Sequence, residues 1–155
     1  MIQRIQSLYL FVIVVLSGLL LNGSVLNFIS KTGSIFKVTF TEVIKSTGGQ
    51  GLEVIEKLLP LTILIIIIPI ISLTAIFLYK KRKYQLVMLR VLITLNSILI
   101  IAVLHVSFRI ISGYGAQLVP GFKMILPVLM LIFAILAFRG IRKDEQLVKS
   151  YDRLR

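Results

Sequence analysis

Four apolar stretches divide the chain and predict four membrane-spanning helices. The clearest of them has no charged residue between Lys57 and Lys80, where four consecutive cations end it. At about 1.5 Å per residue, a helix of this length matches the roughly 30 Å hydrocarbon core of a bilayer. The same pattern predicts spans over about residues 7–28, 58–79, 85–107 and 121–138. We therefore expect an all-α membrane protein in which residues 1–155 form a single four-helix domain.

The first apolar stretch has an alternative interpretation as a cleaved signal peptide. Leu21 and Asn22, however, stand where a cleavage site requires small residues. The stretch is also long enough to span a bilayer. We therefore expect it to remain in the protein as the first transmembrane helix.

A period-two pattern in the longest polar interval, residues 30–57, predicts a β-strand in an outer loop. Phe36, Val38 and Phe40 are apolar and alternate with polar residues, which is typical of a half-buried strand. A single strand is not stable alone, so we expect a partner strand within this loop or in the second outer loop. The charged residues around Glu53 suggest instead a short polar helix that leads into the second span.

Unusual residues inside the predicted spans are the first candidates for function. Pro69 lies in the middle of the second span, where it removes one backbone hydrogen bond and acts either as a hinge or as a static bend. On the third span, helical spacing places Arg90, Thr94, Ser97 and His105 on one side. We expect this polar intramembrane face to point toward the other helices.

The charge distribution orients the predicted spans. The chain has 18 Lys and Arg against 6 acidic residues, and most of these cations fall within residues 1–6, 80–90 and 139–155. Positively charged segments of membrane proteins stay in the cytoplasm. Both termini, including the tail over residues 139–155, are therefore expected in the cytoplasm. Because the cations flank apolar spans, we interpret them as contacts with the anionic inner leaflet and not with nucleic acid.

The residue groupings that most catalytic and metal sites need are missing. The chain has no Cys and a single His, and all acidic residues lie outside the predicted spans. An intramembrane enzyme would require Glu53 or Glu56 to approach His105. We therefore expect a non-catalytic protein without cofactor or metal, acting as an accessory or assembly subunit of a membrane complex. The alternative is a small transporter or channel that uses the polar face of the third span.

The most specific motifs stand at the two ends of the chain, which begins MIQRIQSLYL and finishes IRKDEQLVKSYDRLR. With the four apolar spans between them, these ends resemble the Bacteroidota membrane-protein family called domain of unknown function 4293. The resemblance implies a protein of the bacterial inner membrane and brings no activity with it. It implies that family members share Ile2, Gln3, Arg4, Ile5, Gln6, Arg142, Lys143, Asp144, Glu145, Asp152, Arg153 and Arg155.

Both end motifs lie on the predicted cytoplasmic side of the membrane. We therefore expect the two ends to meet there, or to face a cytosolic partner together. The expected partners are lipids of the anionic inner leaflet and either another membrane protein or a second copy of the chain. The candidate contact residues are Arg4, Lys80, Lys81, Arg82, Lys83, Arg142, Lys143, Asp144, Glu145, Asp152, Arg153 and Arg155.

Overall fold

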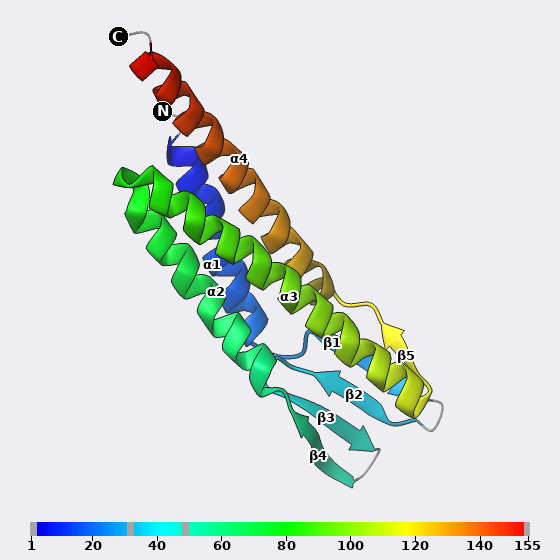
Figure 1. Ribbon diagram of the computed structural model, residues 1–155. Coiled ribbons are helices and arrows are strands. Elements are labelled where there is room, and N and C mark those ends of the chain that lie inside the picture. Colours follow the sequence, from blue (N-terminus) through cyan, green and yellow to red (C-terminus); the bar gives the residue numbers. More distant parts are fainter. Residues whose placement is uncertain (1–2, 31–32, 48–49, 154–155) are drawn as a thin grey trace.

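The computed structural model describes residues 3–30, 33–47 and 50–153, and shows there four helices in an elongated bundle with a β-sheet at one end (Figure 1). The helices are α1 (Gln3–Leu21), α2 (Leu59–Phe77), α3 (Arg82–Tyr114) and α4 (Leu126–Arg153). Short 3-10 segments, η1 (Leu78–Lys80) and η2 (Phe122–Ile125), precede α3 and α4. α1 and α3 each pack against both α2 and α4, so every helix has two neighbours.

Three of the helical segments are long and apolar enough to cross a membrane, and α1 contributes a shorter apolar helix. The three are Leu59–Phe77, Arg82–Tyr114 and Phe122–Gln146, and the shorter one is Ile5–Leu21. They correspond in order to the second, third, fourth and first predicted spans. The chain is therefore a membrane protein by the length and composition of its helices. Residues 139–153 of the tail continue α4 without a break.

The first helix is shorter than the span predicted for it. α1 ends at Leu21, and the apolar residues that follow form strand β1 (Leu26–Ser30). Gly23 has a φ of +77°, which glycine adopts without steric cost. Lys123 donates a hydrogen bond from Nζ to the carbonyl oxygen of Asn22, a group near the helix end that has no partner inside the helix. The chain therefore leaves the helix here despite its continuing apolar character.

Apolar and small side chains fill the space between the helices. Leu10, Ile65, Leu89 and Met130 are fully buried and come from all four helices. Ser72 of α2 is also fully buried, and its Oγ donates to the carbonyl oxygen of Leu10 over 2.8 Å. Association of membrane helices depends on such packing and on hydrogen bonds between helices, because lipid provides no hydrophobic driving force. Ser72 thus attaches α2 to α1 in the middle of the bundle.

Antiparallel strands form the sheet in the order β4-β3-β2-β1-β5 within the described part of the chain. The strands after β1 are β2 (Ile35–Val38), β3 (Glu42–Thr47), β4 (Gln50–Lys57) and β5 (Ala116–Val119). The strand predicted around Phe36 is confirmed as β2, which pairs with β1 and β3. β5 comes from the connection between α3 and α4 and pairs with β1. Both predicted sources of partner strands therefore contribute to the sheet.

The prediction of a short polar helix before α2 is wrong, because the residues around Glu53 belong to strand β4. Across the ladder with β3, Glu53 lies opposite Lys45 and Lys57 lies opposite Glu42. Opposite charges at facing positions stabilise strand pairing. The partner strand, and not the local sequence, determines the conformation here.

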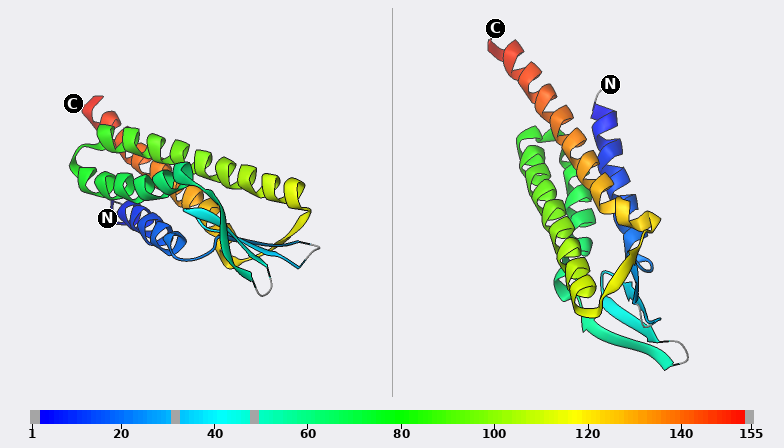
Figure 2. Two further views of the ribbon diagram at one scale, coloured as in Figure 1. Left: turned by 90° about the horizontal axis from the view of Figure 1, so that it is seen from below. Right: turned by 90° about the vertical axis from the view of Figure 1, so that its right-hand side faces the viewer.

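α3 continues beyond its predicted span and supports the sheet (Figures 1 and 2). Its 33 residues measure about 50 Å, more than the thickness of the hydrocarbon core. Near its end Ile110 is buried, and the ring of Tyr114 lies 4.7 Å from the ring of Phe36 on β2. Arg109 forms an exposed ion pair with Glu56 of β4, with 3.1 Å between Nη1 and Oε1. The long helix thus joins the bundle and the sheet.

Substitution of Ser72 tests the packing of α1 against α2. Ser72→Ala removes the donor to Leu10 and should lower the free energy of unfolding by about 0.6 kcal/mol. Ser72→Leu should lower it by about 1–3 kcal/mol, because a fully buried site has no room for the larger side chain. Reversible unfolding in mixed detergent and dodecyl sulfate micelles measures both. Thr74→Ala is the control, since the exposed Thr74 hydroxyl bonds to Ile71 of its own helix. If Thr74→Ala lowered the free energy of unfolding as much as Ser72→Leu does, the assigned packing would be contradicted.

Candidate functional site

The two ends of the chain and the α2–α3 turn lie at one end of the bundle, which we call the terminal end (Figures 1 and 2). The opposite end carries the strands, and we call it the sheet end. An even number of antiparallel helices returns the chain to the side on which it started. The segments that carry both end motifs and the cationic turn are therefore close together in space.

A hydrogen bond joins the two end motifs at the terminal end. Gln6 of α1 is 6% exposed, and its Nε2 donates to Oδ2 of Asp144 on α4 over 2.6 Å. Hydrogen bonds to a carboxylate are stronger than those between neutral groups, and this one links residues at opposite ends of the sequence. The expectation that the two ends meet is confirmed.

Gly140 provides the space that Gln6 occupies. A Cβ at this position would stand 3.1 Å from Cγ of Gln6 and 3.2 Å from its Nε2, so Gln6 would have to shift. Gly140 lies one turn before Asp144 on the same side of α4. Gly140 thus leaves space for the Gln6 side chain, and Asp144 one turn later accepts its hydrogen bond. Sequence reasoning missed Gly140, although a glycine inside a helical segment is a signal of close packing.

Two side chains hold the α2–α3 turn: Arg82 attaches it to α4, and Gln85 attaches α3 to the end of α2. Arg82 donates from Nη1 to the backbone carbonyl oxygen of Asp144 over 3.4 Å. Gln85 is 4% exposed and donates from Nε2 to the carbonyl oxygen of Ala75 over 3.0 Å. Ala75 lies in the last turn of α2, where backbone carbonyls lack partners within the helix. We call Gln6, Arg82, Gln85 and Asp144 the polar cluster. Neither Gln6 nor Gln85 was among the predicted contact residues, although the family resemblance included Gln6.

The polar cluster encloses very little space. With Ser7, Tyr79 and Ile141 it lines a cavity of about 10 Å³, which is about the space of one water molecule. Such a cavity is too small for a substrate or an organic cofactor. The hydrogen bonds of the polar cluster therefore hold the helices in position.

The predicted polar face of α3 points away from the bundle. Arg90, Thr94 and His105 are exposed and Ser97 is half-buried, so the prediction that this face points toward the other helices is wrong. The buried side of α3 carries Asn96 instead. The hydroxyls of Thr94 and Ser97 donate to carbonyl oxygens four residues earlier in the same helix, which satisfies them without a second helix. This face of α3 therefore does not line the interior of the bundle.

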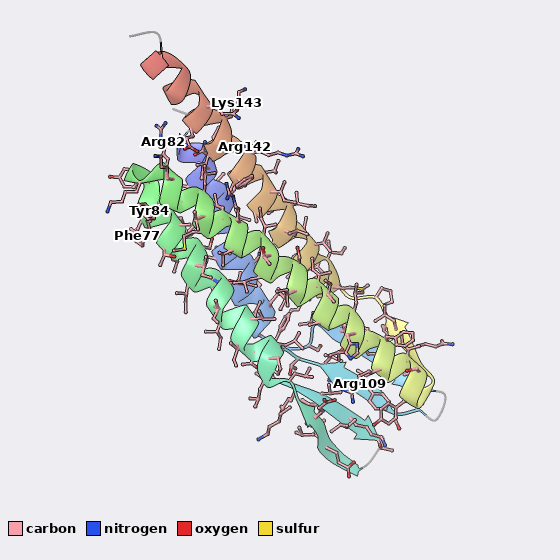
Figure 3. The ribbon with its side chains drawn as sticks, in the orientation of Figure 1. Phe77, Arg82, Tyr84, Arg109, Arg142 and Lys143 are labelled. Atoms are coloured by element: carbon pink, nitrogen blue, oxygen red, sulfur yellow. The ribbon has the colours of Figure 1, made fainter. Side chains whose placement is uncertain are left out.

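Exposed cations surround the polar cluster. Lys81 and Lys83 of the turn are exposed, as are Arg142 and Lys143 of α4. Figure 3 shows Arg82, Arg142 and Lys143 gathered at the terminal end, far from Arg109 at the sheet end. The predicted contact residues whose side chains lie outside the described part of the structure are Arg4, Lys80, Asp152, Arg153 and Arg155.

The acidic residues of the outer loop lie at the sheet end and are matched with cations. Glu56 pairs with Arg109, and Glu53 lies opposite Lys45. Within residues 3–30, 33–47 and 50–153, no three His, Cys, Asp or Glu side chains come together in a way that could hold a metal ion.

The sequence matches a family model described as a domain of unknown function (DUF4293) over residues 2–154. No curated protein and no solved structure matches the chain. The matched region contains both end motifs except Met1 and Arg155, and all four residues of the polar cluster. The description of the family names no activity.

A double-mutant cycle tests the hydrogen bond that joins the end motifs. Asp144→Ala leaves the buried Nε2 of Gln6 without its acceptor and should lower the free energy of unfolding by about 1–3 kcal/mol. Gln6→Ala should have a smaller effect, because the half-buried carboxylate of Asp144 can turn to water. The double variant should cost less than the sum of the two, by about 1 kcal/mol. Unfolding in mixed micelles gives all three values, and strict additivity would show that the two side chains do not interact.

Proposed function

The chain belongs to the domain of unknown function 4293 family, and from that premise we propose that it is a non-catalytic protein of the bacterial inner membrane that acts as an accessory or assembly subunit of a membrane complex. The observation that carries the proposal is the polar cluster. Its side chains join α1, α4 and the α2–α3 turn and leave exposed charged side chains around the junction. A firmly held, charged surface is suited to binding a partner.

The proposed orientation places the terminal end in the cytoplasm and the sheet outside. Exposed Lys81, Lys83 and Lys143 at the terminal end support it, since cationic segments stay in the cytoplasm. Exposed aromatic side chains mark where the membrane would surround the helices but not which end is cytoplasmic, because aromatic rings favour both membrane interfaces. Tyr84 at the terminal end and Phe108 toward the sheet end lie about 36 Å apart along α3, close to the thickness of a bilayer core with part of its interfaces.

Site-specific labelling tests the orientation. The chain has no Cys, so Lys143→Cys and Lys37→Cys each introduce a single thiol at an exposed position. In right-side-out spheroplasts, a membrane-impermeant maleimide should label Lys37→Cys at once and Lys143→Cys only after lysis. The reverse pattern would place the sheet in the cytoplasm and contradict the proposed topology.

Co-purification tests the accessory role. After solubilisation of native membranes in mild detergent, the full chain should elute with a stoichiometric partner, which is a different membrane protein or a second copy. Charge reversal at the terminal end, Lys81→Glu with Lys143→Glu, should lower retention of that partner by about tenfold, equivalent to about 1.4 kcal/mol.

The control at the sheet end is Lys37→Glu, an exposed position whose strand partners, Asn27 and Ile44, carry no charge, so it should leave retention unchanged. Both variants are first checked for intact folding by gel filtration and circular dichroism. A monomer that elutes without companions would refute the accessory role. Equal losses in the two variants would show that the terminal end is not the binding surface.

A further inference from the structure

A groove separate from the polar cluster runs between α3 and α4 near the terminal end. Its volume is about 370 Å³, far more than the cavity inside the polar cluster. The residues that line it are Leu86, Arg90, Phe138, Arg142, Glu145 and Gln146. It is therefore large enough to hold the polar head of a small molecule.

Two arginines from different helices face this groove. Arg90 comes from α3 and Arg142 from α4, and both side chains are exposed. With Glu145, the ionisable residues of the groove carry a formal charge of +1. Guanidinium groups bind phosphate oxygens through paired hydrogen bonds, so the groove suits one singly charged phosphodiester.

The depth of Arg90 favours a lipid over a soluble phosphate. Arg90 lies about 12 Å along α3 from Arg82, the first residue of that helix, at about 1.5 Å per residue, and the helix as a whole is long and apolar enough to span a membrane. The walls beside it are apolar, with Leu86 buried and Phe138 half-buried. A guanidinium at this depth extends toward the headgroup region, where phosphodiester groups of lipids are concentrated.

We propose that the groove between α3 and α4 binds the headgroup of one anionic phospholipid, with Arg90 and Arg142 holding its phosphodiester and Phe138 contacting its acyl chain. Basic pockets between transmembrane helices at the cytoplasmic side are known to bind such headgroups. The amide of Gln146 is a further hydrogen-bond donor to the headgroup. The inference rests on the proposed membrane orientation and does not depend on a protein partner.

A fluorescence experiment with the full chain reconstituted in vesicles tests this site. The protein has no Trp, so Phe138→Trp introduces a single reporter in the groove. Phosphatidylglycerol with brominated acyl chains should quench it with a clear preference over brominated phosphatidylcholine. Phe122→Trp, an exposed position at the sheet end, is the matched reporter and should show no such preference.

Charge-neutralising variants in the Phe138→Trp background identify the residues responsible. Arg90→Gln and Arg142→Gln should each lower the preference for phosphatidylglycerol by about fivefold. Arg139→Gln removes the same charge one turn before Arg142, at an exposed position that does not line the groove, so it should leave the preference unchanged. Arg90→Lys keeps the charge without the paired hydrogen bonds and should fall between the wild-type and the glutamine variant.

Several outcomes would overturn the proposal. They are the absence of a lipid preference at Phe138→Trp, a loss for Arg139→Gln as large as that for Arg142→Gln, and displacement of the lipid by millimolar inorganic phosphate. The second result would indicate general attraction of anionic lipid to the cationic surface, and the third a site for a soluble anion. The co-purification test of the accessory role changes Lys81 and Lys143, whereas the lipid test changes Arg90 and Arg142. Failure of one proposal can therefore be recognised independently of the other.

Discussion

The hydrocarbon core of a bilayer offers no hydrogen-bond partner to a peptide group, and this constraint accounts for most of the fold. Each long apolar segment satisfies its own backbone as a helix, and the strands lie together beyond the bundle (Figure 1). The same constraint acts on side chains. On α3 the hydroxyls of Thr94, Ser97 and Ser107 each donate to the carbonyl oxygen four residues earlier. These polar residues can therefore face lipid without an unsatisfied donor.

Hydrogen bonds between helices accumulate at the terminal end, where Gln6 meets Asp144 and Gln85 meets the end of α2. Such bonds contribute modestly to the stability of a helix bundle inside a membrane. Because of their position, they also influence how the helices are oriented. They set how α4 lies against α1 and the turn, while α3 and α4 also pack against each other. The orientation of α4 in turn places Arg142 across the groove from Arg90. The polar cluster and the proposed lipid site are therefore parts of one arrangement of helices.

The sheet has the corresponding role at the other end of the molecule. The chain between α1 and α2 forms β1 to β4, and the connection between α3 and α4 adds β5 beside β1. One sheet therefore joins both connections between helices. α3 reinforces this junction, because Tyr114 contacts Phe36 and Arg109 pairs with Glu56. Lys123, just before α4, also binds the end of α1 at Asn22. Each end of the bundle thus has its own set of contacts between remote segments.

Properties that depend on a local stretch could be predicted from the sequence. These are the approximate positions of α2, α3 and α4, the turn at the cationic run and the alternation of β2. The common location of the two end motifs followed from the even number of spans. Properties that depend on a remote partner could not. Leu26 and Phe28 extend the apolar run of α1, yet they form β1 because β2 and β5 pair with it. The side of α3 that is buried in the bundle could not be predicted from the sequence either. Lipid is as apolar as the interior of the bundle, so the hydrophobic pattern of a membrane helix does not reveal which side is buried. Only the tertiary structure decided that Asn96 is buried while Arg90 is exposed at the groove between α3 and α4, and that Gln6 reaches Asp144.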